Sequence, residues 1–418
     1  MTSVRTILGG GRGTYVLMLA IAVAVTLTKG IAEIVFPPYL AGYGYSLSAI
    51  GLLTSLIGGL QLLSRVPSGV SYKPERAKRQ YAAAFVIFGI STIGLGFASG
   101  QLIAVAVLSA VHGFAFGALS TFSLAIAIEV SGGKRVGAAM AWFTATNSTG
   151  YAIGYYFGGL GADTIGIPTT LVLAGLVPFV AAAAVFGLPA LVTEHVVERG
   201  KGIRGLFAAT RGLDSRVWLA LVIVLFLNTL QDSLDTFFPV FAPTIGITLT
   251  VVGALRAIRS GAGLFIRFGV AVLLTAVDYR RTTLVAIVAA AIAAAAIPIS
   301  TSFVVLAGLF IILGLTRGIL RATSAASIAE LRGEGKDIGL ASGVYSAGLD
   351  LGAIIGPTAG GAVASVIGIG PMFQVVALAG LVVWLAVALS TPQTREVAGL
   401  AKRHTIGPRT TAGGDDRG

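Results

Sequence analysis

Runs of apolar residues separated by short polar stretches fill almost the whole chain. A helix needs about 20 predominantly apolar residues to cross the hydrocarbon core of a membrane, and breaker residues mark the ends of each run. The pattern predicts an all-α membrane protein with twelve transmembrane helices, several of them long enough to tilt or bend. In the first half we expect helices at about 14–39, 47–70, 80–98, 102–130, 136–161 and 168–188, and in the second half at about 217–241, 249–276, 282–299, 303–331, 338–366 and 371–389.

The sequence repeats itself at a fixed offset. Glu33 falls on Asp235 after a shift of 202 residues, and other residues agree at this offset or at 201. One matched glycine means little among 57 glycines, but charges, a Phe-Pro pair and a glycine series that share one offset indicate an internal duplication. Duplicated halves in a very apolar chain are typical of transporters. The matches include Phe36 and Pro37 with Phe238 and Pro239, Arg65 with Arg267, Lys78 and Arg79 with Arg280 and Arg281, Glu129 with Glu330, and Gly150, Gly154, Gly158 and Gly159 with Gly352, Gly356, Gly360 and Gly361.

The duplication divides the chain into four expected parts. Residues 1–190 form an N-terminal six-helix bundle and residues 217–391 a C-terminal one, which gives two pseudo-symmetric halves. Residues 191–216 are hydrophilic and rich in arginine, so we expect them to be a central loop that links the halves. Residues 392–418 end in a stretch of glycine and aspartate and are expected to be a disordered tail.

Composition narrows the class of protein. Charged residues make up 11% of the chain, hydrophobic residues 56%, and the mean hydropathy is +0.91. A soluble domain carries about 25% charged residues, so most of this chain is expected in a lipid bilayer. The absence of cysteine excludes disulfides and thiolate chemistry. The net charge of +12 does not indicate nucleic-acid binding, because the basic residues lie in loops on one side of the predicted helices.

The basic loops orient the predicted bundle. Lysine and arginine accumulate in the cytoplasmic loops of membrane proteins, and on the opposite side we find essentially one charge, Asp163. Both termini and the central loop are therefore expected in the cytoplasm, and the protein in the cell membrane. The basic residues that decide this are Arg5, Arg12, Lys73, Arg76, Lys78, Arg79, Lys134, Arg135, Arg199, Lys201, Arg204, Arg211, Arg216, Arg280, Arg281, Arg332, Lys336, Lys402, Arg403 and Arg409.

Twelve spans in two tandem halves, with cytoplasmic ends and a central loop, resemble the major facilitator superfamily over nearly the whole chain. That family has a cytoplasmic signature between helices two and three, in which a glycine is followed after three residues by aspartate and then by a basic cluster. Gly69, Lys78 and Arg79 match it, whereas Lys73 stands at the aspartate position. We expect Arg65 and Arg267 near the cytoplasmic surface as gate or snorkelling residues, and Glu129 and Glu330 as replacement partners for loop arginines.

A second family motif, typical of antiporters, reads G-x8-G-x3-G-P-x2-G-G in helix five. Here helix eleven carries it in full, and helix five carries a weaker form with Ala141 and Tyr155 at the first glycine and the proline. Glycines four apart let helices approach closely, and a proline permits a bend. Close packing and a functional hinge both remain open. The glycines and proline concerned are Gly150, Gly154, Gly158 and Gly159, and Gly343, Gly352, Gly356, Pro357, Gly360 and Gly361.

Charged and polar side chains within the predicted spans are the candidate site. A charge at membrane depth costs several kcal/mol, about 2.5 to 3.5 on insertion scales, and so requires a partner or a function. The family resemblance implies that helices one, four, seven and ten line a central cavity, where most of these residues fall. The candidates are Lys29, Glu33, His112, Asn228, Gln231, Asp232, Asp235, Arg256, Arg259, Arg317, Arg321 and Asp350.

Each candidate also has a structural interpretation. Lys29 and Glu33 are four residues apart on one helix face and would form an ion pair. Asp232 and Asp235 would neutralise the arginines of the next helix, Arg256 and Arg259. Arg317 and Arg321 would pair with Asp350, and His112 would be a hydrogen-bonded packing residue rather than a proton relay.

The sequence predicts a secondary active transporter of a small solute that works by alternating access. It lacks a nucleotide-binding glycine–lysine loop, so proton coupling through Glu33 and Asp235 is the expected energy source. Drug or metabolite efflux and organic-anion transport remain alternatives, the second favoured by the arginines. A membrane-embedded enzyme is a remote alternative, and a channel suits the duplicated halves less well. We expect no cofactor or metal, no nucleic-acid partner, and a monomer with its solute, protons and lipid as partners.

Overall fold

The computed structural model describes residues 12–73, 75–131, 136–189, 215–276, 279–333, 338–390 and 395; the side chains of residues 12, 136, 215, 267–280, 325–344, 346 and 347 lie outside this description. The described residues form twelve long α-helices and two short 3-10 helices. The α-helices are α1 (Arg12–Gly42), α2 (Leu47–Ser71), α3 (Ala77–Phe97), α4 (Leu102–Val130), α5 (Val136–Thr164), α6 (Ile167–Val185), α8 (Ser215–Phe241), α9 (Leu249–Ala276), α10 (Tyr279–Ala296), α11 (Phe303–Gly333), α12 (Ile338–Ile367) and α13 (Ile369–Leu389), and the 3-10 helices are η1 (Ala242–Ile245) and η2 (Ile297–Ile299).

The predicted twelve-helix architecture is confirmed. The bounds of α4 and α9 are those expected from the sequence, and the other helices begin and end within a few residues of the expected positions. Eleven of the helices are long and apolar enough to cross a membrane within the part of the chain described. Helix α5 is the exception, because its middle carries Thr144, Asn147, Ser148 and Thr149.

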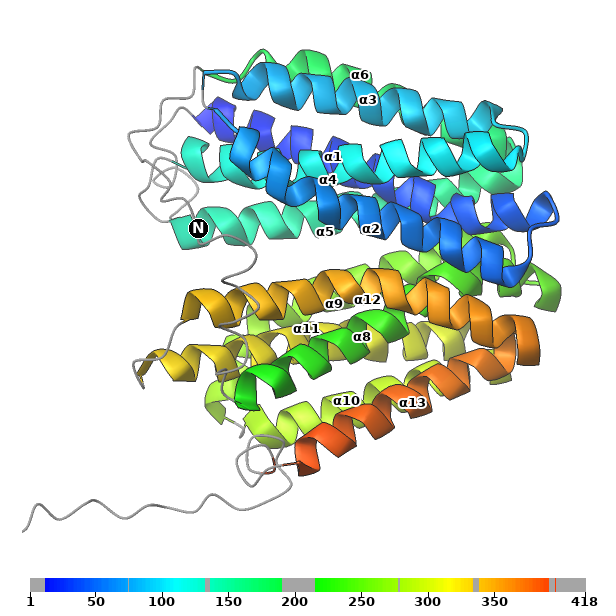
Figure 1. Ribbon diagram of the computed structural model, residues 1–418, viewed down its shortest axis with the longest axis vertical. Coiled ribbons are helices and arrows are strands. Elements are labelled where there is room, and N and C mark those ends of the chain that lie inside the picture. The colour runs from blue at the N-terminus through cyan, green and yellow to red at the C-terminus, as the bar shows by residue number, and fades with distance from the viewer. Residues whose placement is uncertain are drawn as a thin grey trace, which may run out of the picture.

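The helices form two bundles, α1–α6 and α8–α13, which lie one above the other in Figure 1. Both bundles use the same turns. Gly44 and Gly246, 202 residues apart, both have a φ of +79°, and Gly166 and Gly368 have φ values of +83° and +86°. A residue with a Cβ rarely adopts this left-handed conformation. The duplication therefore extends to the backbone conformation of the loops.

Glycines also make equivalent contacts inside each bundle. A Cβ on Gly154 of α5 would lie closer than 3.0 Å to the carbonyl oxygen of Leu27 in α1, and one on Gly356 of α12 would lie equally close to that of Thr229 in α8. Both pairs are 202 residues apart. Gly150 and Gly158 also lie against α1, and Gly352 and Gly360 against α8. These glycines of the two motifs are close-packing positions; the surroundings of Gly343 lie outside the described side chains.

Two helix pairs join the bundles at one end of the molecule. A Cβ on Gly51 of α2 would lie closer than 3.0 Å to the carbonyl oxygen of Pro357 in α12, and one on Gly253 of α9 would lie equally close to that of Tyr155 in α5. Gly361 meets Leu47 and Gly159 meets Leu249 in the same manner. We call this end, where α1 ends and α2 begins, the far end, and the opposite end, with Lys73, Lys78 and Arg281, the basic end. Backbones in such close contact close the far end.

Large apolar side chains cover much of the outer surface. Val66, Ile103, Val180, Val304 and Val366 are mostly exposed although they lie in long helices. Soluble monomers rarely expose extended apolar surface, whereas a bilayer solvates it. One cluster of buried apolar side chains lies within the first bundle, and a second cluster contains residues of both bundles.

Candidate functional site

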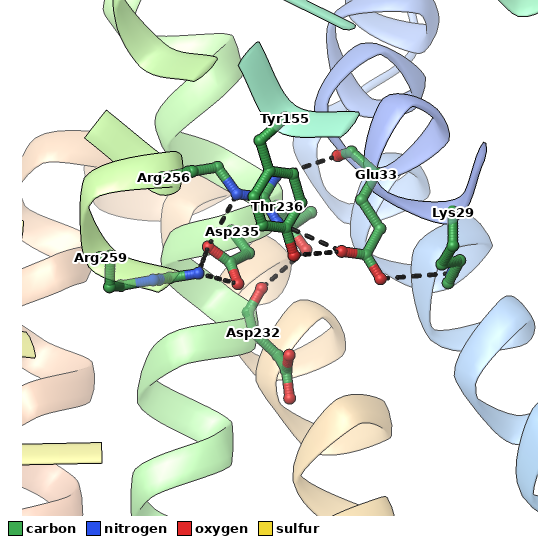
Figure 2. A network of polar contacts seen from close by, with 8 residues as sticks. All are labelled: Lys29, Glu33, Tyr155, Asp232, Asp235, Thr236, Arg256 and Arg259. Atoms are coloured by element: carbon green, nitrogen blue, oxygen red, sulfur yellow. Dashed lines mark hydrogen bonds and ion pairs between the residues drawn. The ribbon is translucent and has the colours of Figure 1, made fainter. Parts of the chain in front are cut away.

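A chain of five charged residues runs between the bundles, as Figure 2 shows. Lys29 Nζ lies 3.5 Å from Glu33 Oε1, and Arg256 Nη2 lies 3.3 Å from Glu33 Oε2. Arg256 Nε lies 3.3 Å from Asp235 Oδ1, and Arg259 Nη2 lies 2.7 Å from both carboxylate oxygens of Asp235. The expected pairing of Lys29 with Glu33, and of Asp235 with the arginines of the next helix, is therefore found.

This central network connects the two halves of the molecule. Lys29 and Glu33 belong to α1, Asp235 to α8, and Arg256 and Arg259 to α9. The Glu33–Arg256 contact thus crosses from one bundle to the other, and Arg256 Nη1 also donates to the main-chain carbonyl of Glu33 at 3.3 Å. Both arginine side chains are almost fully buried, and charge-assisted hydrogen bonds are strong where water is excluded.

Tyr155 completes the network and was missed by sequence reasoning. Its hydroxyl donates to Glu33 Oε2 at 2.8 Å, and its ring lies 3.9 Å from the guanidinium carbon of Arg256. A cation above an aromatic face is stabilised by the ring's negative potential. The sequence does carry a signal, because Tyr155 occupies the position in α5 where α12 has Pro357, but this position alone indicates only a weakened glycine motif.

Two cavities flank the central network. The larger, of about 320 Å³, lies between α1, α5, α8, α9 and α11, and we call it the polar cavity. The smaller, of about 90 Å³, lies between α1, α2, α3, α4, α8, α9 and α12. Glu33, Asp232 and Asp235 line both. The remaining lining residues of the polar cavity are Thr144, Asn147, Ser148, Tyr151, Tyr155, Arg259, Ser260, Gly263, Arg317 and Arg321.

Asp232 and Arg317 differ from the network residues. Both line the polar cavity, and neither carries an ion pair or a side-chain hydrogen bond among the residues that the structure describes. Figure 2 shows the carboxylate of Asp232 pointing away from the Asp235–Arg259 pair. The Nε of Arg317 is inaccessible and has no acceptor within the described part of the chain. We expected both Asp232 and Asp235 to neutralise Arg256 and Arg259. Asp235 does so, whereas Asp232 forms no ion pair with either arginine.

Asn228 and Gln231 lie on α8 but have different surroundings. Asn228 Nδ2 donates to the carbonyl of Leu349 at 2.8 Å, and its Oδ1 accepts from Arg321 Nη2 at 3.2 Å. Asn228 thereby connects α8 to α11 and α12. The carboxamide of Gln231 is buried with no hydrogen-bond partner in the described part of the chain, and it does not line either cavity.

Asp350 has a different partner from the one expected. Its Oδ2 lies 2.8 Å from Nη1 of Arg65, so the pair joins α2 of one half to α12 of the other. The alternative that Arg317 and Arg321 pair with Asp350 is wrong, because Arg65 takes that position. Arg65 is thus a contact between the halves, in addition to lying in the part of α2 nearer the basic end.

His112 is hydrogen-bonded and packed. Its Nδ1 lies 3.2 Å from Thr92 Oγ1, and its ring lies 4.5 Å from that of Phe88. It is almost completely buried and lines the smaller cavity together with Lys29. These contacts favour the packing interpretation over a proton relay.

The residues of the cytoplasmic signature lie at the basic end. Lys78 donates to the carbonyl of Leu188 after α6, whereas Gly69 and Arg79 are exposed. Burial and the carboxylate of Glu129 raise the pKa of Tyr72, which follows α2. Glu129 is therefore close to Tyr72. The side chains of Arg267 and Glu330 lie outside the described residues.

At the far end, Asp163 of α5 binds the first turn of α9. Its Oδ2 accepts from the amide and the hydroxyl of Thr250 at 2.7 and 2.6 Å, and its Oδ1 accepts from the amide of Leu249 at 3.3 Å. A carboxylate at a helix N-terminus satisfies free amides and complements the helix dipole. The one charge expected on this side thus helps to close the far end.

Comparison with known proteins gives a consistent result. The family model described as Major Facilitator Superfamily matches residues 18–303 and 279–409. A point mutant of the nucleoside transporter NupG superimposes with a TM-score of 0.78 at 13% identity, over 90% of this chain and 98% of that one. A bacterial homologue of the human lysosomal transporter Spinster, in an inward-facing, unoccupied conformation, gives 0.69 at 15% identity over 96% of each chain. No curated protein sequence matches this chain.

Proposed function

This chain belongs to the major facilitator superfamily and is a multi-pass membrane transporter, and we propose that it carries a small polar solute by alternating access, coupled to protons. In this proposal the two bundles rock about the central network, and the polar cavity is the solute site. Its volume, about 320 Å³, is at the lower end of the range for ligand pockets, about 300 to 1,000 Å³.

The proposed orientation has the basic end in the cytoplasm of the cell. Lys73, Arg76, Lys78, Arg79 and Arg281 support it, because cytoplasmic loops are enriched in lysine and arginine. The close glycine contacts and Asp163 close the opposite end. In the proposed orientation the closed far end faces away from the cytoplasm, and solute would reach the polar cavity from the cytoplasmic side.

The contact between Glu33 and Arg256 is the observation that carries the proton coupling. Glu33 lies 3.3 Å from Arg256 and 3.5 Å from Lys29, whereas Asp235 lies 3.3 Å from Arg256 and 2.7 Å from Arg259. The side chain of Glu33 is 30% exposed, against 16% for Asp235. We therefore assign the coupling proton to Glu33, which is the more exposed of the two and whose contact with Arg256 crosses between the halves.

Protonation of Glu33 would act on the contact between the halves. A neutral Glu33 no longer attracts Arg256, so the link between α1 and α9 weakens, while Asp235 retains both arginines within the second half. The bundles can then separate at this level. A proton and the solute would in this way bias the same equilibrium between two conformations, which is what coupling requires.

The test uses purified protein in liposomes. A counterflow screen with radiolabelled leucine, uridine and benzoate first identifies a transported probe, and accumulation of that probe is then measured with and without a pH gradient. We expect Glu33→Gln to keep counterflow and to lose the response to the gradient, with a smaller loss for Asp235→Asn. If both variants still accumulate the probe in response to the gradient, Glu33 and Asp235 are not the coupling residues.

An organic-anion carrier is the second candidate. Arg317, which has no carboxylate partner among the described residues, favours it. Efflux of lipophilic drugs receives less support from the site, because carboxylate and guanidinium side chains make up much of the polar cavity's lining. Accumulation of benzoate without leucine or uridine in the same liposomes would identify the anion carrier.

A further inference from the structure

Asp232 and Arg317 are two opposite charges that share a cavity without meeting. Asp232 belongs to α8 and Arg317 to α11, and both line the polar cavity. They form no ion pair with each other, and no side chain or main-chain group of the described residues satisfies either one. The network charges beside them, by contrast, are all paired.

Unpaired charges at this depth are costly. Removing an ion from water costs several kcal/mol unless a partner compensates it, and an ionisable residue within a membrane is by default a functional-site candidate. While no solute is bound, water in the cavity can solvate both charged groups. A solute that displaces this water must replace both sets of interactions, or it loses affinity through the group left unpaired.

We propose that the polar cavity binds a small zwitterion, with its ammonium group at Asp232 and its carboxylate at Arg317. This inference deepens the proposed transport function and rests on it. A guanidinium holds a carboxylate through parallel hydrogen bonds, which fixes its orientation. Tyr151 and Asn147, on the α5 wall of the same cavity, offer further polar contacts.

The charge balance of the cavity supports a zwitterion over a simple anion or cation. Its lining includes three carboxylates, of Glu33, Asp232 and Asp235, and three guanidinium groups, of Arg259, Arg317 and Arg321. The lining is therefore neutral as a whole. An anion bound to Arg317 would leave Asp232 unpaired beside it, and an amine bound to Asp232 would leave Arg317 unpaired, whereas a zwitterion satisfies both and keeps the site neutral.

The test compares three molecules that differ by one charged group. Leucine carries both groups, 4-methylpentanoate lacks the ammonium, and 3-methylbutylamine lacks the carboxylate. Thermal stabilisation of the purified full-length protein in detergent reports binding, because a ligand of the folded state raises Tm. We expect leucine, or one of two further zwitterions, phenylalanine and alanyl-alanine, to bind about tenfold or more tightly than its analogues that lack one charge.

Two variants assign the ends of the solute. Asp232→Asn should abolish the preference for leucine over 4-methylpentanoate, and Arg317→Gln should abolish the preference for leucine over 3-methylbutylamine. Arg281→Gln is the matched control, because Arg281 is an exposed arginine at the basic end that does not line the polar cavity. It should leave all three affinities unchanged. A variant that fails to fold is recognised by its lost unfolding transition, and Asp232→Ser and Arg317→Met, which also lack the charge and carry the same expectations, then replace it.

Several outcomes would overturn the inference. It is wrong if no zwitterion of the panel raises Tm, or if uridine or 4-methylpentanoate binds as tightly as the zwitterions. It is also wrong if Asp232→Asn keeps leucine counterflow unchanged and loses only the response to a pH gradient, since Asp232 would then carry the proton. Leucine binding without a response to the gradient would instead retain the zwitterion site and contradict the proton coupling, so the two proposals fail separately.

Discussion

Gly51 and Gly253 occupy equivalent positions of the two repeats and make the same kind of contact. Thr54 and Arg256, three residues further along the same helices, are also equivalent in position, but their contacts differ. Each glycine lies against a carbonyl oxygen of the opposite half. Arg256 joins Glu33 and Asp235, while the hydroxyl of Thr54 is buried without a partner in the described part of the chain. At these positions the duplication has thus kept the packing contact and allowed the neighbouring polar residue to diverge.

The divergence places most of the cavity charge in the second half. Asp232, Arg259 and Arg317 are equivalent to Gly30, Ile57 and Phe116 of the first half at offsets of 202 and 201. The first half contributes Lys29 and Tyr155 in return, where the second half has Gln231 and Pro357. The equivalent packing positions provide two bundles that can move against each other. The charged residues between them differ from one half to the other, so the site can bind a solute that has two different ends.

The largest expected effect comes from the shared glycines. Gly51→Ala and Gly253→Ala each place a Cβ closer than 3.0 Å to a backbone oxygen of the other half, so the far end cannot close without a shift. Overpacking of this kind costs about 1–3 kcal/mol, which shifts a two-state equilibrium by about 5- to 150-fold. We expect labelling of a single cysteine at Thr54 by a membrane-impermeant thiol reagent to rise accordingly; the chain has no cysteine of its own.

Controls for this prediction lie on the same two helices. Gly59 of α2 and Gly261 of α9 have no atom within 4 Å of an added Cβ. Gly59→Ala and Gly261→Ala should therefore leave the labelling unchanged. Equal labelling of all four variants would mean that the glycine contacts do not control the far end. A rise for only one of Gly51 and Gly253 would show that the two helix pairs do not open together.

The next effect concerns the equivalent pair that has diverged. Arg256→Gln leaves Glu33 without its guanidinium partner and Asp235 with one instead of two, and breaking a buried pair costs about 3–5 kcal/mol. Thr54→Val removes a hydroxyl that has no partner among the described residues and should be neutral or slightly stabilising. Thermal unfolding in detergent measures both. If Arg256→Gln and Thr54→Val lose similar amounts of stability, the central network does not depend on Arg256.

The helices were predictable from the sequence because their signal is local. The bounds of α4 and α9 follow from where apolar residues begin and end, and the bilayer fixes the minimum length. The Lys29–Glu33 pair was predictable for a related reason, since residues four apart on a helix lie on one face. The offset of 202 residues likewise predicted which positions of the two halves would be equivalent.

Contacts between the halves were not predictable in the same way. Arg65 and Asp350 are 285 residues apart in the sequence. From the sequence alone, any of several arginines could have neutralised Asp350 equally well. Tyr155 was overlooked because its role depends on Glu33 and Arg256, which belong to two other helices. A local pattern reports the face of a helix, whereas the partner on that face is set by how the helices pack.

The smallest expected effect separates the two helix pairs that join the halves. Asp163 caps α9 at the far end, whereas Asp350 meets Arg65 on the side of α2 nearer the basic end, and Arg65 is 39% exposed. Loss of a negative charge at a helix N-terminus costs about 0.3–1 kcal/mol, so Asp163→Asn should raise labelling at a cysteine replacing Thr54 by up to about fivefold. Asp350→Asn should not raise it, because opening the far end does not require that contact to break. If Asp350→Asn raises the labelling as much as Asp163→Asn does, the contact of Arg65 belongs to the closure of the far end, and the two helix pairs act as one.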